Sequence, residues 1–246
     1  LTEISAPDGY VFDSTPHPFT LAAVDKQTAI VEVKVSASNT YLPVRVTLRK
    51  QKEDLLLTQT REGMIHQTVE VYPGDGFVFG LFTGEIIAYG DSQKLPANTL
   101  VATGTTDAQG NLTFSGNLPH GAYTIRELDG PKGWKLNPNR FDVRISPENQ
   151  ADDAPVIRVA LDGTVRNELI YTKVTLTKTD ITGAETVPGA EIEVKNEQGE
   201  VIYRAVTDEN GEASVSVKAG DVVSATSEKL VIVPPCCVII ADATGL

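Results

Sequence analysis

The chain is 246 residues long, carries a formal net charge of −12 at pH 7 and is rich in glycine, proline, threonine and valine. The negative charge argues against nucleic acid or an anionic membrane surface as a partner, because both would repel the protein. The composition suits strands and turns rather than helices. We recognise neither a signal peptide nor a membrane-spanning stretch, so no membrane insertion is expected within these residues.

The first predicted unit, residues 1–41, has the features of the C-terminal part of a truncated β-sandwich repeat. Residues 1–10 keep the Glu-x-x-x-Pro-x-Gly-aromatic frame of residues 125–134, and such internal repetition indicates tandem domains. Leu1 reads as the middle of a strand, so we expect the chain to begin inside a domain.

The second predicted unit, residues 42–169, has the pattern of one complete domain. Alternating or apolar stretches read as strands at 46–50, 76–82, 110–114, 121–127 and 140–145. Alternation is clearest in the last of these, where Phe141, Val143 and Ile145 are expected to face the core. Short strands separated by turn signals indicate an antiparallel β-sandwich.

The third predicted unit, residues 170–246, begins like the second. Its stretch 174–178 repeats the Val-Thr-Leu-x-Lys pattern of the preceding unit. The tail 219–246 is atypical, and both a truncated or frame-shifted end and a divergent strand fit it. Its adjacent cysteines, Cys236 and Cys237, lack the spacing of a metal site.

Three polar side chains fall in inward registers of predicted strands. In the strand that passes through Glu127, Tyr123 and Ile125 mark the face that points to the core, and Glu127 shares that face. Lys50 ends one apolar register, and Asn167 interrupts another. Because a buried charged group requires a partner, we expect these three side chains to meet inside the middle domain.

Each of the three residues also has an ordinary explanation. Lys50 could extend out of a strand end, Glu127 could close a strand at the surface, and Asn167 could be a turn residue. The agreement of three registers with the internal repeats favours the shared site.

The motifs together resemble the Cna protein B-type domain, and more narrowly the SpaA-like, prealbumin-like pilin repeats of Gram-positive surface proteins. The resemblance rests on the order and spacing of Val-Thr-Leu-x-Lys, Gly-x-x-Phe-x-Leu-Phe, Thr-Asp-x-x-Gly, Gly-x-Tyr-Thr-Ile-Arg-Glu, Pro-x-Gly-Trp/Tyr and Val-x-Asn, and it extends to about residue 218. It implies an all-β fold of tandem immunoglobulin-like (prealbumin-like) antiparallel β-sandwich domains.

Many domains of that family form an internal isopeptide bond between a lysine and an asparagine, assisted by a buried acid. By this resemblance Lys50 is the nucleophile, Glu127 the catalytic acid and Asn167 the acceptor. Burial lowers a lysine pKa and raises a glutamate pKa, so the pair can become a neutral amine beside a protonated acid. Glu127, hydrogen-bonded to the carboxamide oxygen, would then stabilise the intermediate and shuttle protons until ammonia leaves. The reaction occurs once, so we do not expect an enzyme in the usual sense.

By the same resemblance, the two outer units hold incomplete sites. The first keeps an acid, Glu3, and an acceptor, Asn39, but no lysine. The third keeps a lysine, Lys178, but its acid and acceptor cannot be placed. Only the middle unit is therefore expected to form the bond.

Neither a metal nor a cofactor is expected. The histidines are widely separated, stand near turns or loops and have no metal or triad pattern beside them, so we expect solvated side chains. They are His17, His66 and His120.

The sequence leaves three functions open. The first is a structural stalk repeat of an extracellular, cell wall-anchored adhesin or pilin-like protein, with neighbouring repeats of the same chain as partners. The second is a module that binds a host extracellular matrix protein or a glycan, for which the insertion at 85–100 is the obvious surface. The third is a spacer attached to a surface hydrolase.

Overall fold

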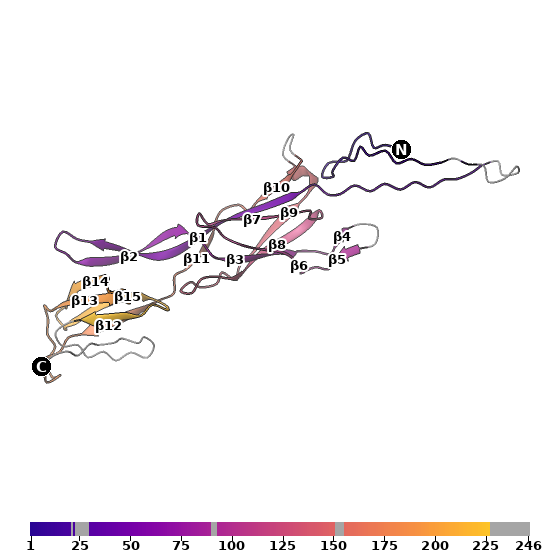
Figure 1. Cartoon of the computed structure of the whole chain (residues 1–246). Coiled ribbons are helices and arrows are strands. Elements are labelled where there is room, and N and C mark those ends of the chain that lie inside the picture. Colours follow the sequence, from indigo (N-terminus) through magenta and orange to yellow (C-terminus); the bar gives the residue numbers. More distant parts are fainter. Residues whose placement is uncertain (21, 23–29, 90–92, 151–154, 227–246) are drawn as a thin grey trace.

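The computed structural model describes residues 1–20, 22, 30–89, 93–150 and 155–226, and everything below concerns these residues. Their regular structure consists of sixteen β-strands and one short 3-10 helix, η1 (Pro147–Asn149), which confirms the all-β fold class. Figure 1 shows two groups of strands, with the N-terminal segment extending away from the larger group. No helix in this part of the chain is long and apolar enough to cross a membrane.

Eleven of these strands lie within residues 42–169. They are β1 (Val44–Gln59), β2 (Ile65–Pro73), β3 (Val78–Thr83), β4 (Ile87–Tyr89), β5 (Gln93–Leu95), β6 (Leu100–Thr105), β7 (Asn111–Gly116), β8 (Gly121–Asp129), β9 (Arg140–Ile145), β10 (Ile157–Ala160) and β11 (Val165–Asn167). Burial alternates along the first half of β1, where Val44, Val46 and Leu48 are buried while Arg45 and Arg49 are exposed. This period of two is the one that the sequence predicts for a half-buried strand.

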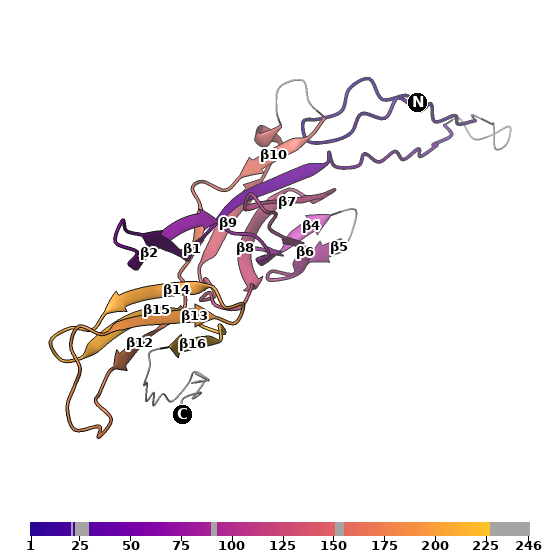
Figure 2. The ribbon, with the colours of Figure 1, turned by 60° about the vertical axis from the view of Figure 1, so that its left-hand side comes forward.

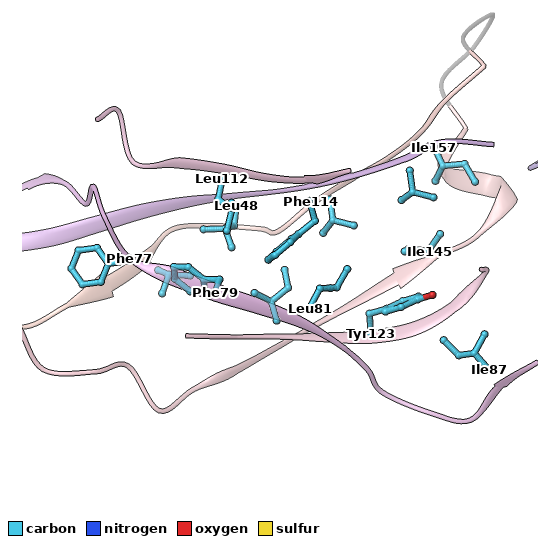
Figure 3. Close-up of a cluster of buried hydrophobic side chains, with 14 of the residues drawn as sticks. Leu48, Phe77, Phe79, Leu81, Ile87, Leu112, Phe114, Tyr123, Ile145 and Ile157 are labelled. Carbon is cyan, nitrogen blue, oxygen red and sulfur yellow. The ribbon is translucent and has the colours of Figure 1, made fainter. Parts of the chain in front are cut away.

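Two sheets enclose one apolar core in the middle region. One sheet contains β1 between β7 and β10, and the other has the order β6-β3-β8-β9. In Figure 3, Leu48 and Phe114 of the first sheet face Phe79, Leu81 and Tyr123 of the second. Burying each such side chain contributes about 1.5–3 kcal/mol, so this cluster dominates the stability of the sandwich.

Strand β1 changes partners half-way along its length. Up to Arg49 it pairs with β7 and β10, and from Lys50 onward it pairs with β2 and β11. Most strand pairs are antiparallel, as expected, but β10 and β11 run parallel to β1. Parallel neighbours require a crossover, and here the chain returns from β9 in the facing sheet through η1. The first and last strands of the region consequently lie side by side.

Residues 171–226 repeat this plan with fewer strands. They form β12 (Tyr171–Thr177), β13 (Glu191–Asn196), β14 (Val201–Val206), β15 (Glu212–Lys218) and β16 (Val223–Thr226). The β12–β15 pair corresponds to β1–β7, and the order β14-β13-β16 corresponds to β6-β3-β8. This group has a core of its own, which includes Leu176, Ile192 and Val215. Within the atypical tail, β16 pairs with β13, whereas residues 227–246, with both cysteines, lie outside the described residues, and the origin of the tail stays a prediction.

A long hairpin formed by β1 and β2 extends the middle region toward the second strand group. Figure 2 shows this hairpin beside β14, and Arg204 of β14 pairs with Ile65 of β2. The side-chain amide of Gln67 on β2 makes two hydrogen bonds with the backbone of Ser216, each 2.9 Å long. The hairpin therefore joins the sheets of the two groups, a connection that the sequence did not predict.

The described part of residues 1–41 contains no β-strand. Tyr10 and Tyr41 form one isolated antiparallel bridge, and Leu1 is not in a strand, contrary to the expectation. A strand requires a hydrogen-bonded neighbour along its length. In these described residues the pairing is confined to short stretches, around that bridge and between the backbones of Leu1 and His17. Their assignment to a preceding sandwich domain stays a prediction.

The insertion at 85–100 contains a small separate sheet. Strands β4 and β5 pair with each other, and residues 90–92 lie outside the described part of the chain. Ile87 at the start of β4 is buried in the main core, whereas the preceding Ile86 is exposed. The insertion is therefore anchored by Ile87 and, at its other end, by Leu95, which packs against the same core. Its role as a ligand surface stays a prediction.

Candidate functional site

Three polar side chains meet at one end of the sandwich core. Lys50 lies on β1, Asn167 on the parallel strand β11, and Glu127 on β8 of the facing sheet. Asn167 stands opposite Lys52 in the β1–β11 register, so Lys50 and Asn167 are diagonal neighbours on the same face. The exposed fractions are 0% for Lys50, 2% for Asn167 and 6% for Glu127. The structure thus brings together the three residues that the sequence singled out.

The carboxamide of Asn167 lies between the amine and the carboxyl group. The Nζ of Lys50 donates a hydrogen bond to Asn167 Oδ1 at 2.5 Å, and Asn167 Nδ2 donates to Glu127 Oε1 at 2.5 Å. The same Nζ lies 3.7 Å from Glu127 Oε2. It also donates to the backbone carbonyl oxygens of Gln51 at 3.0 Å and Val165 at 3.5 Å. The amine is therefore held directly against the carboxamide.

Burial shifts the two titratable groups toward their neutral forms. Burial lowers the pKa of Lys50 from 10.5 to about 8, although the neighbouring Glu127 carboxylate opposes this shift. Burial likewise raises the pKa of Glu127, against the hydrogen bond from Asn167 and the charge of Lys50. The ring of Phe77, whose centroid lies 4.3 Å from Nζ, forms part of the apolar wall. Removal from water penalises both charges, although the face of the Phe77 ring favours the charged amine.

The two carboxyl oxygens of Glu127 have different surroundings. Oε1 accepts the hydrogen bond from Asn167 and a longer one, 3.5 Å, from the backbone N–H of Asn137. Oε2 is buried and has no hydrogen-bond partner among the described residues. The sequence predicted a hydrogen bond between Glu127 and the carboxamide oxygen of Asn167. In the structure Glu127 instead accepts from the carboxamide nitrogen, because the oxygen accepts a hydrogen bond from Lys50. The carboxyl group therefore faces the amine with one oxygen and the amide nitrogen with the other.

This arrangement combines the parts of an acyl transfer. A neutral amine is a nucleophile, a carboxamide is an acyl donor, and a carboxyl group in contact with both can carry protons between them. Among the described residues, no group of three or more His, Cys, Asp or Glu side chains is placed to hold a metal ion. The amine, the carboxamide and the carboxyl group all belong to the chain itself.

The incomplete site expected in the first unit is present as a pair. Asn39 Nδ2 donates to Glu3 Oε1 at 2.6 Å, through the same atoms that join Asn167 to Glu127. The other carboxylate oxygen of Glu3 accepts from the backbone N–H of Asp13 at 2.7 Å. The pair reproduces the acid and amide half of the middle site.

Lys178 has the backbone position of Lys50 but a different environment. Its N–H donates to the carbonyl oxygen of Gly211 at 2.8 Å, just as the N–H of Lys50 donates to that of Gly110 at 2.7 Å. The side chain of Lys178 is half-buried, whereas that of Lys50 is fully buried. The repeat therefore preserves the backbone of the site without its burial.

The histidine predictions were wrong in two places. His66 is exposed but lies within β2 rather than in a loop. His120 does lie in the β7–β8 loop, but it packs against the rings of Tyr10 and Tyr41, at centroid distances of 5.6 and 5.0 Å. Burial lowers the pKa of His120. A turn from the N-terminal unit covers this loop, and the sequence alone gave no signal of that contact.

The comparisons with known proteins relate both strand groups to one family. The family described as SpaA, prealbumin-like fold domain, matches residues 74–156 and 172–224. The comparison with curated proteins finds no match.

Several solved structures are similar. The Bacillus anthracis TIE protein is 23% identical with a TM-score of 0.53, over 92% of this chain and 35% of that one. This chain thus spans about a third of the TIE protein, and the likeness concerns the fold alone. The shaft pilin SpaA from Lactobacillus rhamnosus GG is 17% identical over 78% of this chain and 89% of that one, with a TM-score of 0.31. The major pilin SpaD from Corynebacterium diphtheriae is 20% identical over 62% and 40%, with a TM-score of 0.33.

Proposed function

The chain belongs to the family of SpaA prealbumin-like fold domains, and from this premise we propose that it is a stalk segment of a Gram-positive adhesin or pilin-like surface protein. Residues 42–169 are one complete domain of that stalk, residues 1–41 end the preceding domain, and residues 170–246 belong to the next. The partners of each domain are its neighbours in the chain. The protein acts outside the cell, attached to the cell wall.

The middle domain carries an autocatalytic isopeptide bond between Lys50 and Asn167. The observation that supports this is the fully buried amine held 2.5 Å from the carboxamide oxygen, with Glu127 bridging amine and amide nitrogen. Stability alone does not explain the buried lysine, because a buried ion pair often stabilises a fold no more than apolar residues of the same volume do.

The reaction proceeds through the carboxyl group of Glu127. Its Oε2 takes a proton from Lys50, which leaves a neutral amine beside a carboxylic acid. The amine then forms the Nζ–Cγ bond with Asn167. Glu127 gives this proton to Nδ2 and takes another from Nζ as the Cγ–Nδ2 bond breaks. The products are the secondary amide, ammonia and protonated Glu127, so atoms and charge balance.

The bond gives the stalk a mechanical function. It connects β1 to the parallel β11 and closes a loop between residues that are 117 positions apart. A cross-link of that span stabilises a domain by about 5 kcal/mol if the loop-entropy estimate for disulfides applies. Unlike a disulfide, the amide survives reduction. Because the first and last strands carry it, tension that enters through one strand passes to the other without loading the core.

Intact-mass spectrometry tests this proposal. The folded chain is expected to be lighter than its sequence by one ammonia. Glu127→Ala is expected to restore the full mass by removing the proton carrier, and Asn167→Ala by removing the acceptor. Peptide mapping should find the branched peptide that contains Lys50 and Asn167.

Lys178→Met provides the matched control, because Lys178 has the same backbone position in the next unit. This variant should keep the loss of ammonia, whereas Lys50→Met should abolish it. A native chain of full sequence mass would refute the bond and leave the stalk proposal to rest on the family alone.

A further inference from the structure

A Pro-x-Gly-aromatic turn occurs twice in the chain, as residues 7–10 and 131–134, and neither copy contributes to the Lys50 site. In the first copy, Tyr10 bridges Tyr41, and Gly9 accepts a hydrogen bond from the N–H of Leu42 at 2.9 Å. The N–H of Val11 donates to the carbonyl oxygen of Thr40 at 2.8 Å. The turn is thus paired with the residues that lead directly into β1.

The second copy makes the same contacts at the next junction. Trp134 bridges Leu169, Gly133 accepts from the N–H of Ile170 at 2.8 Å, and the N–H of Lys135 donates to Glu168 at 2.9 Å. Residues 168–170 lead directly into β12, as residues 40–42 lead into β1. The two junctions therefore share one backbone arrangement.

Each turn also receives a side chain from the following strand group. His120, in the connection between β7 and β8, packs on the first turn, and Lys218, at the end of β15 before the connection to β16, packs on the second. Lys218 Nζ lies 3.5 Å from the ring centroid of Trp134, close enough for a cation–π interaction. The two receiving residues occupy corresponding connections of the repeated strand plan.

The glycine of the turn makes this close approach possible. Gly9 and Gly133 have φ values of +86° and +94°, in the region that favours glycine. A Cβ on Gly9 would lie 2.4 Å from Cε1 of His120, and one on Gly133 would lie 2.6 Å from Cε of Lys218. A side chain at either position would displace the residue that packs on it.

We propose that the Pro-x-Gly-aromatic turn is the docking joint of the stalk, the element through which each domain fixes the orientation of the next. The backbone of the turn binds the linker. Its glycine and its aromatic ring contact the β7–β8 connection at the first junction and the end of β15 at the second. The partner of the joint is the following domain of the same chain. This inference rests on the proposed division into domains but not on the isopeptide bond.

Trp134 is the single tryptophan of the chain, so its fluorescence reports on the second joint alone. Gly133→Ala is expected to move Lys218 off the indole ring, to shift the emission to the red and to increase quenching by acrylamide. Small-angle scattering should show a wider distribution of distances between the two strand groups.

Gly163→Ala is the matched control. Gly163 also has a positive φ, +78°, but a Cβ there would meet nothing within 4 Å. It therefore carries the same backbone cost without the steric clash, and both readouts should stay at their native values. Equal behaviour of the two variants would overturn the proposal.

A second variant separates loss of docking from misfolding. Lys218→Ala removes the two atoms nearest to a Cβ at position 133, Cε at 2.6 Å and Cγ at 3.2 Å. Gly133→Ala should therefore widen the distance distribution much less in that background. Additive effects would contradict a direct contact. The series is repeated in Asn167→Ala, in which no isopeptide bond can form. The effects of Gly133→Ala should be the same there, so the test of the docking joint does not depend on the test of the bond.

Discussion

Lys50 and Lys178 occupy the same position in two copies of one strand plan, yet only Lys50 is fully buried. Their backbone N–H groups donate to equivalent glycine carbonyls, and their strands make equivalent antiparallel pairs. Around Lys50, β11 adds Asn167 and β8 adds Glu127. The difference teaches that the lysine position belongs to the fold, whereas its burial and its polar partners come from the strands that cover it.

The largest effect on stability is expected from a substitution that removes the proposed cross-link at Lys50 and leaves Lys178 in place. Lys50→Met should lower the free energy of unfolding of the middle region by about 5 kcal/mol, because the unfolded chain regains the entropy of the closed loop. Lys178→Met should change stability by less than about 1 kcal/mol, as is usual for a partly exposed charge. Urea unfolding of both variants measures the contrast, and similar losses would contradict the bond.

The next effect depends on pH and uses a chain that cannot react. In Asn167→Ala the buried amine remains, and its pKa in the native structure, about 8, lies below the 10.5 of an exposed lysine. Above pH 10.5 the amine is neutral in both states, and as the pH falls toward 8 the unfolded state gains the proton first. Stability is therefore expected to rise by about 3 kcal/mol between pH 8 and pH 10.5.

The reference for this titration is Asn167→Ala combined with Lys50→Met, which keeps Glu127 but lacks the amine. Equilibrium unfolding of both variants across the pH range isolates the contribution of Lys50. Parallel curves would show that the amine is not desolvated.

A smaller effect concerns the contact between the two strand groups. Gln67→Ala removes two hydrogen bonds to the backbone of Ser216, worth about 1–2 kcal/mol together. The substitution should destabilise residues 171–226 and leave the stability of the region around Lys50 unchanged. Hydrogen exchange at the Ser216 amide should accelerate, whereas Thr68→Ala, an exposed neighbour on β2, should have no such effect. Uniform acceleration in both groups would contradict a local role.

The smallest effect is expected at the half-site of the first unit. Asn39→Ala removes the hydrogen bond to Glu3 and should cost less than about 1 kcal/mol, because both side chains are only half-buried. The loss of ammonia from the middle region should persist. A change in that loss would mean that Asn39 also serves as an acceptor.

Much of the middle region could be predicted because its signals are local. The period-two burial of β1 and the inward face of Tyr123, Ile125 and Glu127 can be read directly from alternation. Lys50 and Asn167 stood out because polar residues interrupted apolar registers. The match of strand patterns between repeats predicted where Lys178 would lie.

The remaining features depend on contacts between distant segments. Gln67 lies on an ordinary polar strand, and nothing near it predicts that it pairs with Ser216. The orientation of the Asn167 carboxamide follows from competition between Lys50 and Glu127 for its two ends, which a register cannot resolve. His120 resembled a solvated loop residue because the turn that covers it lies more than a hundred positions away.

The pairing of β2 with β14 has a consequence for vectorial synthesis. A chain that is synthesised from its N-terminus can form the β1–β2 hairpin before β14 has been made. The next strand group can then assemble on a template that already exists, which reduces the search for its long-range pairings. Each strand group would then begin to fold on an exposed strand of the group before it, so that the groups fold in the order in which they stand in the chain.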